Sequence, residues 1–144
     1  MPGRDPTHWL HRLDAEEWLR AAVNELTRAE AALLRKQHRP GVAGARRAAG
    51  MAWNAVLVAH EDSAYGRSYM DHLRALVADA SVAEPVREAA TALLEAPLET
   101  NVIPLGRGDT RMAECARVIV DEARRRVGPP PAPRSPSSSL SPSS

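Results

Sequence analysis

The stretch Ala45-Arg-Arg-Ala-Ala-Gly-Met-Ala-Trp-Asn-Ala-Val-Leu-Val-Ala59 decides the fold. Apolar residues occupy almost every side of a helix built from it, which is typical of a helix that other helices surround. Its alanines and its glycine are small enough to let neighbouring helices approach closely. Asn54 lies within this apolar run and needs a hydrogen-bond partner if it is buried. We therefore expect this stretch to form the central, most buried helix of the protein.

The composition of the whole chain also favours helices over strands. Hydrophobic residues make up 44% of the 144 residues, aromatic residues make up only 3%, and there is no Phe. Strands favour aromatic and β-branched side chains, whereas alanine, which is abundant here, is the best helix former. The longest apolar stretch is far shorter than the ~20 residues that a membrane span needs. The composition excludes an all-β fold and a membrane span, and it predicts one helical domain over residues 1–128.

Apolar residues that recur every three or four positions predict the remaining helices. Short connections between such segments favour antiparallel neighbours. We therefore predict an all-α fold, an antiparallel up-and-down bundle of four to five helices. The expected helices cover residues 15–37, 42–60, 68 onward, 85–95 and 110–127, residues 7–13 form a short extra turn, and residues 101–105 form an extended apolar loop that docks on the bundle.

Local signals mark where these helices begin and end. Asp14 and Ser68 each precede an acidic residue at the spacing of a capping box. Pro40-Gly41 is expected to stop the first helix, Pro85 suits the first position of the fourth, and Asp109 is expected to cap the last. Residues 129–144 are dominated by Pro and Ser, a composition that cannot bury enough apolar surface to order the chain. We expect them to form a disordered tail.

The charge balance and the single cysteine limit the classes of function. The chain has 19 Lys and Arg and 18 Asp and Glu, and Arg134 is the only charged residue of the tail, so residues 1–128 are neutral. A neutral domain lacks the basic surface that drives non-specific nucleic-acid binding. Cys115 alone forms no internal disulfide, and the first residues contain no apolar signal segment. We expect a cytoplasmic protein.

No strong metal or cofactor motif is present. The five histidines form no H-x-x-x-H pair and no H-E-x-x-H pair. Cys115 is interpreted as a small buried hydrophobic residue. We therefore predict no metal and no cofactor. A metal site could be drawn from the polar residues near one turn, but a solvated loop is the stronger interpretation of His60, Glu61, Asp62, Asp71 and His72.

One further pattern is Arg67-Ser-Tyr-Met-Asp-His72, at the start of the third expected helix. With this pattern the chain resembles HEPN domains, which are small helical bundles, often dimeric, that carry an R-x4-to-6-H motif. Residues 45–59 resemble the helix that those domains bury, residues 65–76 the segment that follows it, and residues 113–127 their last helix. Many active members have Asn, Asp or His directly after the Arg, where this chain has Ser. On an ideal helix Arg67 and His72 lie about 140° apart, so a joint site needs a non-helical Arg67 or a second copy.

The resemblance implies two classes of function. Some HEPN domains are non-catalytic and pair with a small nucleotidyltransferase or bind a nucleotide. Our leading hypothesis is a module that acts by protein association, as a homodimer or with such a partner. Other members cleave RNA without a metal, which implies His72 as the proton-transfer group and Arg67 as the group that holds the phosphate. A third hypothesis is a structural helical adaptor unrelated to HEPN domains. An exposed apolar patch near Trp9 or Trp18 would favour association.

Overall fold

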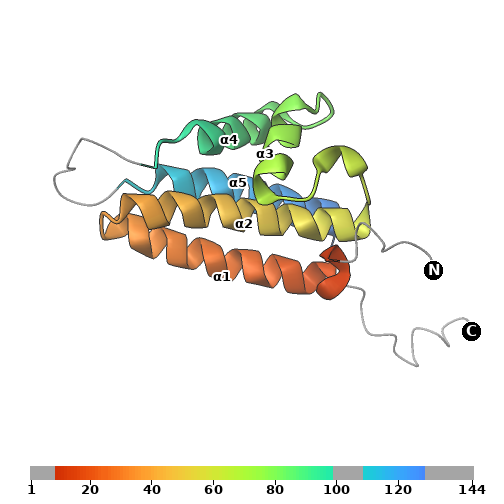
Figure 1. The fold of residues 1–144 in the computed structure, drawn as a ribbon, viewed down its shortest axis with the longest axis horizontal. Helices are drawn as coiled ribbons and strands as arrows, with labels where there is room; N and C mark the ends of the chain where they lie inside the picture. The colour runs from red at the N-terminus through yellow and green to blue at the C-terminus, as the bar shows by residue number, and fades with distance from the viewer. Residues whose placement is uncertain (1–8, 99–108, 129–144) are drawn as a thin grey trace, which may run out of the picture.

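The computed structural model describes residues 9–98 and 109–128. In these two ranges the chain forms α-helices, short 3₁₀ turns and no strand, which confirms the predicted all-α class. Helices α1, α2 and α5 lie side by side, and α3 and α4 cover one side of this layer (Figure 1). The antiparallel arrangement of the bundle stays a prediction. The elements are η1 (Leu10–Arg12), α1 (Ala15–Leu34), α2 (His38–Ala59), η2 (Ser63–Tyr65), α3 (Tyr69–Ala78), α4 (Glu84–Glu95) and α5 (Arg111–Val127).

A tight turn separates α1 from α2. Helix α1 begins with the predicted capping box, in which Asp14 Oδ1 accepts from the Glu17 N–H at 2.8 Å and Glu17 Oε1 accepts from the Asp14 N–H at 2.9 Å. The helix ends at Leu34, earlier than predicted, because Lys36 adopts a left-handed backbone with φ of 64°. We predicted that Pro40 stops α1, and this prediction is wrong. Pro40 lies in the first turn of α2, where a missing N–H breaks no helical hydrogen bond.

Helix α2 is the central helix, as the sequence predicts. It packs against α1, α3, α4 and α5, and most of its alanines are fully buried. Gly50 is a point of close approach, since a Cβ there would overlap the Tyr69 side chain of α3. The Arg47 guanidinium donates two hydrogen bonds to Glu25 Oε2, at 2.7 and 3.0 Å, which join α2 to α1.

The starts of α3 and α5 depend on acidic side chains. Ser68 and Asp71 form the predicted capping box of α3, with the Asp71 N–H donating to Ser68 Oγ at 3.0 Å and the Ser68 N–H to Asp71 Oδ2 at 3.2 Å. We predicted that Asp109 caps α5, but the N-cap is Thr110. Asp109, the residue before the N-cap, still accepts a hydrogen bond at Oδ1 from the Arg111 N–H, at 2.9 Å. Its carboxylate therefore satisfies the N–H of the first residue of α5.

Helix α4 is attached to α2 through its C-terminal end. The Arg46 guanidinium of α2 donates to the Leu93 carbonyl at 2.8 Å and to the Ala96 carbonyl at 2.7 Å. Carbonyls at a helix end lack intrahelical partners, and a cation there also interacts favourably with the helix dipole. Pro85 is in the first turn as predicted, although the helix begins one residue earlier, at Glu84.

A single hydrophobic core includes buried residues of every α-helix. The short turn expected over residues 7–13 is η1, whose Leu10 is 2% exposed and accepts a hydrogen bond at its carbonyl from the Trp18 indole at 2.8 Å. Among the residues that the structure describes, no helix is long and apolar enough to cross a membrane. The predictions for residues 101–105 and 129–144 fall outside the described residues.

Candidate functional site

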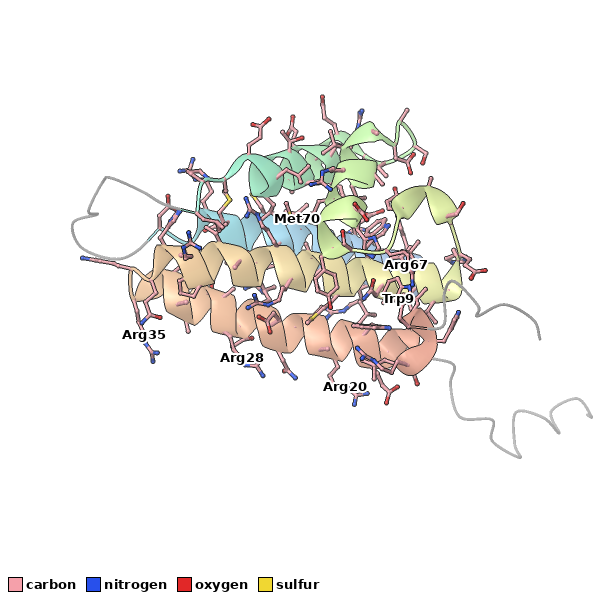
Figure 2. The ribbon with its side chains drawn as sticks, in the orientation of Figure 1. Trp9, Arg20, Arg28, Arg35, Arg67 and Met70 are labelled. Carbon is pink, nitrogen blue, oxygen red and sulfur yellow. The ribbon has the colours of Figure 1, made fainter. Side chains whose placement is uncertain are left out.

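The turn before α3 places Arg67 at the surface. Gly66 has φ of 69°, a left-handed conformation in which a side chain is strained, and Ser68 caps the helix. Arg67 lies between them, outside the helix and exposed. Trp9 and Arg67 lie at the same end of the molecule (Figure 2). Both line a pocket of about 660 Å³ whose other lining residues are Leu10, Leu57, Glu61, Asp62, Ser63 and Gly66.

His72 lies inside the protein, with no exposed surface. Its Nδ1 atom is 2.7 Å from the Tyr65 carbonyl oxygen, and its Nε2 atom is 2.8 Å from the Asn54 side-chain oxygen. Asn54 is also fully buried and therefore needs a hydrogen-bond partner, which is His72. The imidazole therefore joins α3 to α2 and to the end of η2.

The geometry around His72 determines the charge of its ring and which nitrogen carries the proton. Burial lowers the pKa of His72, although the Tyr65 carbonyl and the Asp71 charge oppose the shift. The ring is therefore neutral at pH 7 and carries its proton on Nδ1, because a carbonyl can only accept. Nε2 is then an acceptor. The Asn54 NH2 group has no partner among the described residues, and it matches this acceptor when the amide is turned so that the NH2 group faces Nε2.

Two aromatic rings enclose the imidazole. Trp9 stacks on it with ring centroids 6.4 Å apart and planes inclined by 21°, and Tyr69 packs edge-on at 6.5 Å. No hydrogen bond joins the Arg67 side chain to His72 in the described part of the chain, and His72 does not line the pocket of Arg67. One copy of the protein thus holds Arg67 in solvent and His72 in the core. Their roles in RNA cleavage stay a prediction.

Three of the polar residues that could have formed a metal site, Asp62, Asp71 and His72, have other partners. Asp62 Oδ1 accepts from the Ala64 N–H at 3.0 Å, and Asp71 caps α3. Within residues 9–98 and 109–128, no group of three or more His, Cys, Asp and Glu side chains is placed to hold a metal ion. Cys115 is half-buried against the core, and burial raises the pKa of its thiol, so it is a poor nucleophile.

A groove of about 1000 Å³ lies between the first half of α1 and the last turns of α5. Leu19 and Val23 of α1 form its apolar floor. Charged side chains of both signs form its rim, and Arg20 is one of several arginines along the outer edge of α1 (Figure 2). These rim residues are Glu16, Arg20, Asp121, Arg124 and Arg125, and Gly128 closes the groove at the end of α5.

This groove was not predicted from the sequence. Val23 was predicted as part of the buried face of its helix, but it is only half-buried. Trp18, named as a possible exposed patch, is 3% exposed and belongs to the core. The available signal was the pattern of Glu16, Leu19, Arg20 and Val23, which alternates charge and apolar residues along one helix face.

Comparison of the chain with protein-family models, with curated proteins and with solved structures finds no match. The geometry of the described residues therefore carries the functional proposal.

Proposed function

We propose that the protein is a HEPN-like helical module that acts by association, and that its partner is a second copy of itself docked at the groove between α1 and α5. The observation that carries the proposal is an apolar groove floor bordered by charges of both signs. Further support comes from the central packing of α2 with α3 and α5, the three elements that contain the HEPN-like segments.

The rim charges suit a symmetric pair. Glu16 and Asp121 stand in the same groove as Arg20, Arg124 and Arg125. In a two-fold interface the same patch on both copies comes together, so a patch with both signs can place arginines of one copy against carboxylates of the other. Neither Arg20 nor Arg124 has an ion pair among the described residues, so both are free to form one with a partner.

The floor supplies the apolar part of such an interface. Leu19 is 5% exposed and Val23 is half-buried, and both lie between charged residues of the rim. A groove of this kind accepts a protruding apolar side chain while the rim charges fix the register and exclude wrong partners. The neutral charge of residues 1–128 disfavours RNA as the partner, because RNA binding draws its affinity from phosphate neutralisation.

Sedimentation velocity of the full chain over a range of micromolar concentrations tests the proposal. We expect a dimer for the wild type. Val23→Arg places a charge on the groove floor and should weaken the dimer by at least about tenfold. The matched control is Val77→Arg, at an apolar residue of α3 that is 36% exposed and lies outside the groove. The control should remain dimeric.

Circular dichroism shows that each variant is folded before its mass is interpreted. A wild type that stays monomeric at every concentration contradicts self-association, and it directs the search to a different partner, such as the nucleotidyltransferase that the HEPN resemblance implies. A Val23→Arg variant that dimerises like the wild type shows that the groove is not the interface. Equal disruption by Val77→Arg leads to the same conclusion.

A further inference from the structure

A separate pocket lies where the end of α2, the η2 turn, the connection from α3 to α4, and α5 meet. Its volume is about 350 Å³, in the range of about 300–1,000 Å³ that is typical of small-molecule sites. Trp53, Val56 and Leu57 of α2 supply an apolar lining, to which Tyr65 adds a second ring stacked on Trp53 at 5.8 Å. The polar lining consists of His60, Asp62, Asp79, Ser81 and Arg126.

The positive and negative groups of this pocket come from different elements. The Arg126 guanidinium of α5 lies 5.2 Å from the centre of the Trp53 ring, so the cation and the indole share one side. The two carboxylates come from other segments of the chain. Asp62 is the N-cap of η2, and Asp79 is the C-cap of α3. The pocket therefore holds charges of both signs.

Existing hydrogen bonds hold the carboxylates in place. Asp79 accepts from the Tyr65 hydroxyl at 2.6 Å and from the Ser81 hydroxyl at 2.6 Å. Asp62 uses one oxygen for the Ala64 N–H, which leaves the other oxygen without a hydrogen bond among the described residues. Burial and Asp79 raise the pKa of the Tyr65 phenol, so the hydroxyl stays a donor. Groups that are already positioned bind a ligand with a smaller loss of conformational entropy.

The charge of the pocket is unbalanced. The lining holds one guanidinium and two carboxylates, and Arg126 is also hydrogen-bonded from Nε to Glu122 outside the pocket, at 2.7 Å. The Arg126 charge acts on Asp79, but neither Asp62 nor Asp79 has a counter-ion at hydrogen-bonding distance in the described part of the chain. A ligand for this pocket therefore needs a cationic group.

Trp53 fixes the position of the cation. The Arg126 guanidinium lies over the indole ring, 5.2 Å from its centre, and the ring is 1% exposed. Cations are attracted to the face of an indole ring. Only the Nε atom of Arg126 has a hydrogen-bond partner among the described residues, so its terminal nitrogens are the donors on this side of the pocket.

From these observations we propose that the pocket binds a small zwitterion of the amino-acid class. Its ammonium group lies between the Asp62 and Asp79 carboxylates. Its carboxylate group lies against the terminal nitrogens of the Arg126 guanidinium. Its apolar side chain contacts Val56 and Leu57. This site is independent of the groove between α1 and α5, since the two share no lining residue.

Isothermal titration calorimetry of the full chain with three matched probes tests the proposal. L-norvaline carries both charged groups, butylamine carries only the ammonium, and valerate carries only the carboxylate. We expect saturable binding of norvaline and binding at least about tenfold weaker for each half-ligand. In ¹H–¹⁵N spectra the Trp53 indole N–H signal should shift as norvaline is added.

Variants locate the binding site. Asp62→Asn keeps the acceptor of the η2 cap but removes the charge, and Arg126→Gln removes the guanidinium. Each should weaken norvaline binding by about tenfold, whereas the control Arg74→Gln, at an exposed arginine of α3 outside the pocket, should not change it. If Arg126→Gln fails to fold, Asp62→Asn decides. The proposal is overturned by absence of saturable norvaline binding, by unchanged binding in folded Asp62→Asn, or by half-ligands that bind as tightly as norvaline.

Discussion

His72 shows how a buried titratable residue couples stability to pH. The ordinary histidine pKa of 6.5 applies to the unfolded chain, while burial lowers the pKa of His72 in the folded protein. Below pH 6.5 the unfolded state therefore binds a proton that the folded state does not accept. The stability is fully present above this pH and decreases as the pH falls below it, by at most about 1.4 kcal/mol per pH unit.

Urea unfolding at about pH 7.5 and about pH 5.5 measures this effect, because the lowered pKa values of Asp71 and Asp79 act only at more acidic pH. We expect the wild type to lose stability between the two conditions. His72→Gln should be less stable at the higher pH, since Asn54 loses its partner, but its stability should change less with pH. The control is His60→Gln, at an exposed histidine. A His72→Gln variant with the wild-type pH dependence would disprove the coupling.

At the residue scale, the sequence predicted that Asn54 must be hydrogen-bonded but not which residue is its partner. An asparagine inside an apolar helix had to be hydrogen-bonded, and Asn54 is. That its partner is His72 depends on how α3 crosses α2, which in turn depends on the close contact of Tyr69 with Gly50. Spacing along one helix gave Arg67 and His72 a common motif. It could not show that one lies before the cap and the other in the core.

At the scale of elements, Arg46 is the clearest link between two helices. Its guanidinium bonds the carbonyls of Leu93 and Ala96, and a third bond reaches Leu94 at 3.4 Å. Arg46→Ala leaves these carbonyls without their charged donor, so we expect a loss of about 1–3 kcal/mol in the free energy of unfolding. Hydrogen exchange should report faster opening of the last turn of α4.

The control for this change is Arg74→Ala, which removes an exposed ion pair with Asp71 on α3. Exposed pairs contribute little, so a change below about 0.5 kcal/mol is expected. If Arg46→Ala is no more destabilising than Arg74→Ala, the attachment of α4 through its C-terminal carbonyls does not contribute to stability.

The element boundaries show which local signals are reliable. Capping boxes predicted the starts of α1 and α3 correctly, because the cap residues interact only with their own helix. The prediction from Pro40 was wrong, because proline is equally compatible with the end of one helix and with the first turn of the next. Lys36 adopts positive φ without being Gly or Asn, and its sequence gives no warning of this.

At the scale of the whole molecule, the groove between α1 and α5 arises from two helices far apart in the chain. Periodicity assigned Val23 and Leu19 to one apolar face, and burial confirms this for Leu19. How far α5 extends over that face depends on tertiary packing, so the half-exposure of Val23 could not be predicted from the sequence. The same holds for the pocket beneath Arg126, whose lining comes from four separate segments.

Self-association through the groove makes the stability of the whole protein depend on its concentration. If folded copies pair and unfolded chains do not, mass action stabilises the folded state by about 1.4 kcal/mol per dimer for each tenfold rise in concentration. We expect the midpoint of thermal unfolding of the wild type to rise by a few degrees over that range. The midpoint of Val23→Arg should rise less with concentration than that of the wild type, whereas Val77→Arg should follow the wild type. Scanning calorimetry at matched concentrations makes the comparison, and a wild-type midpoint that does not move would contradict pairing of the folded chains.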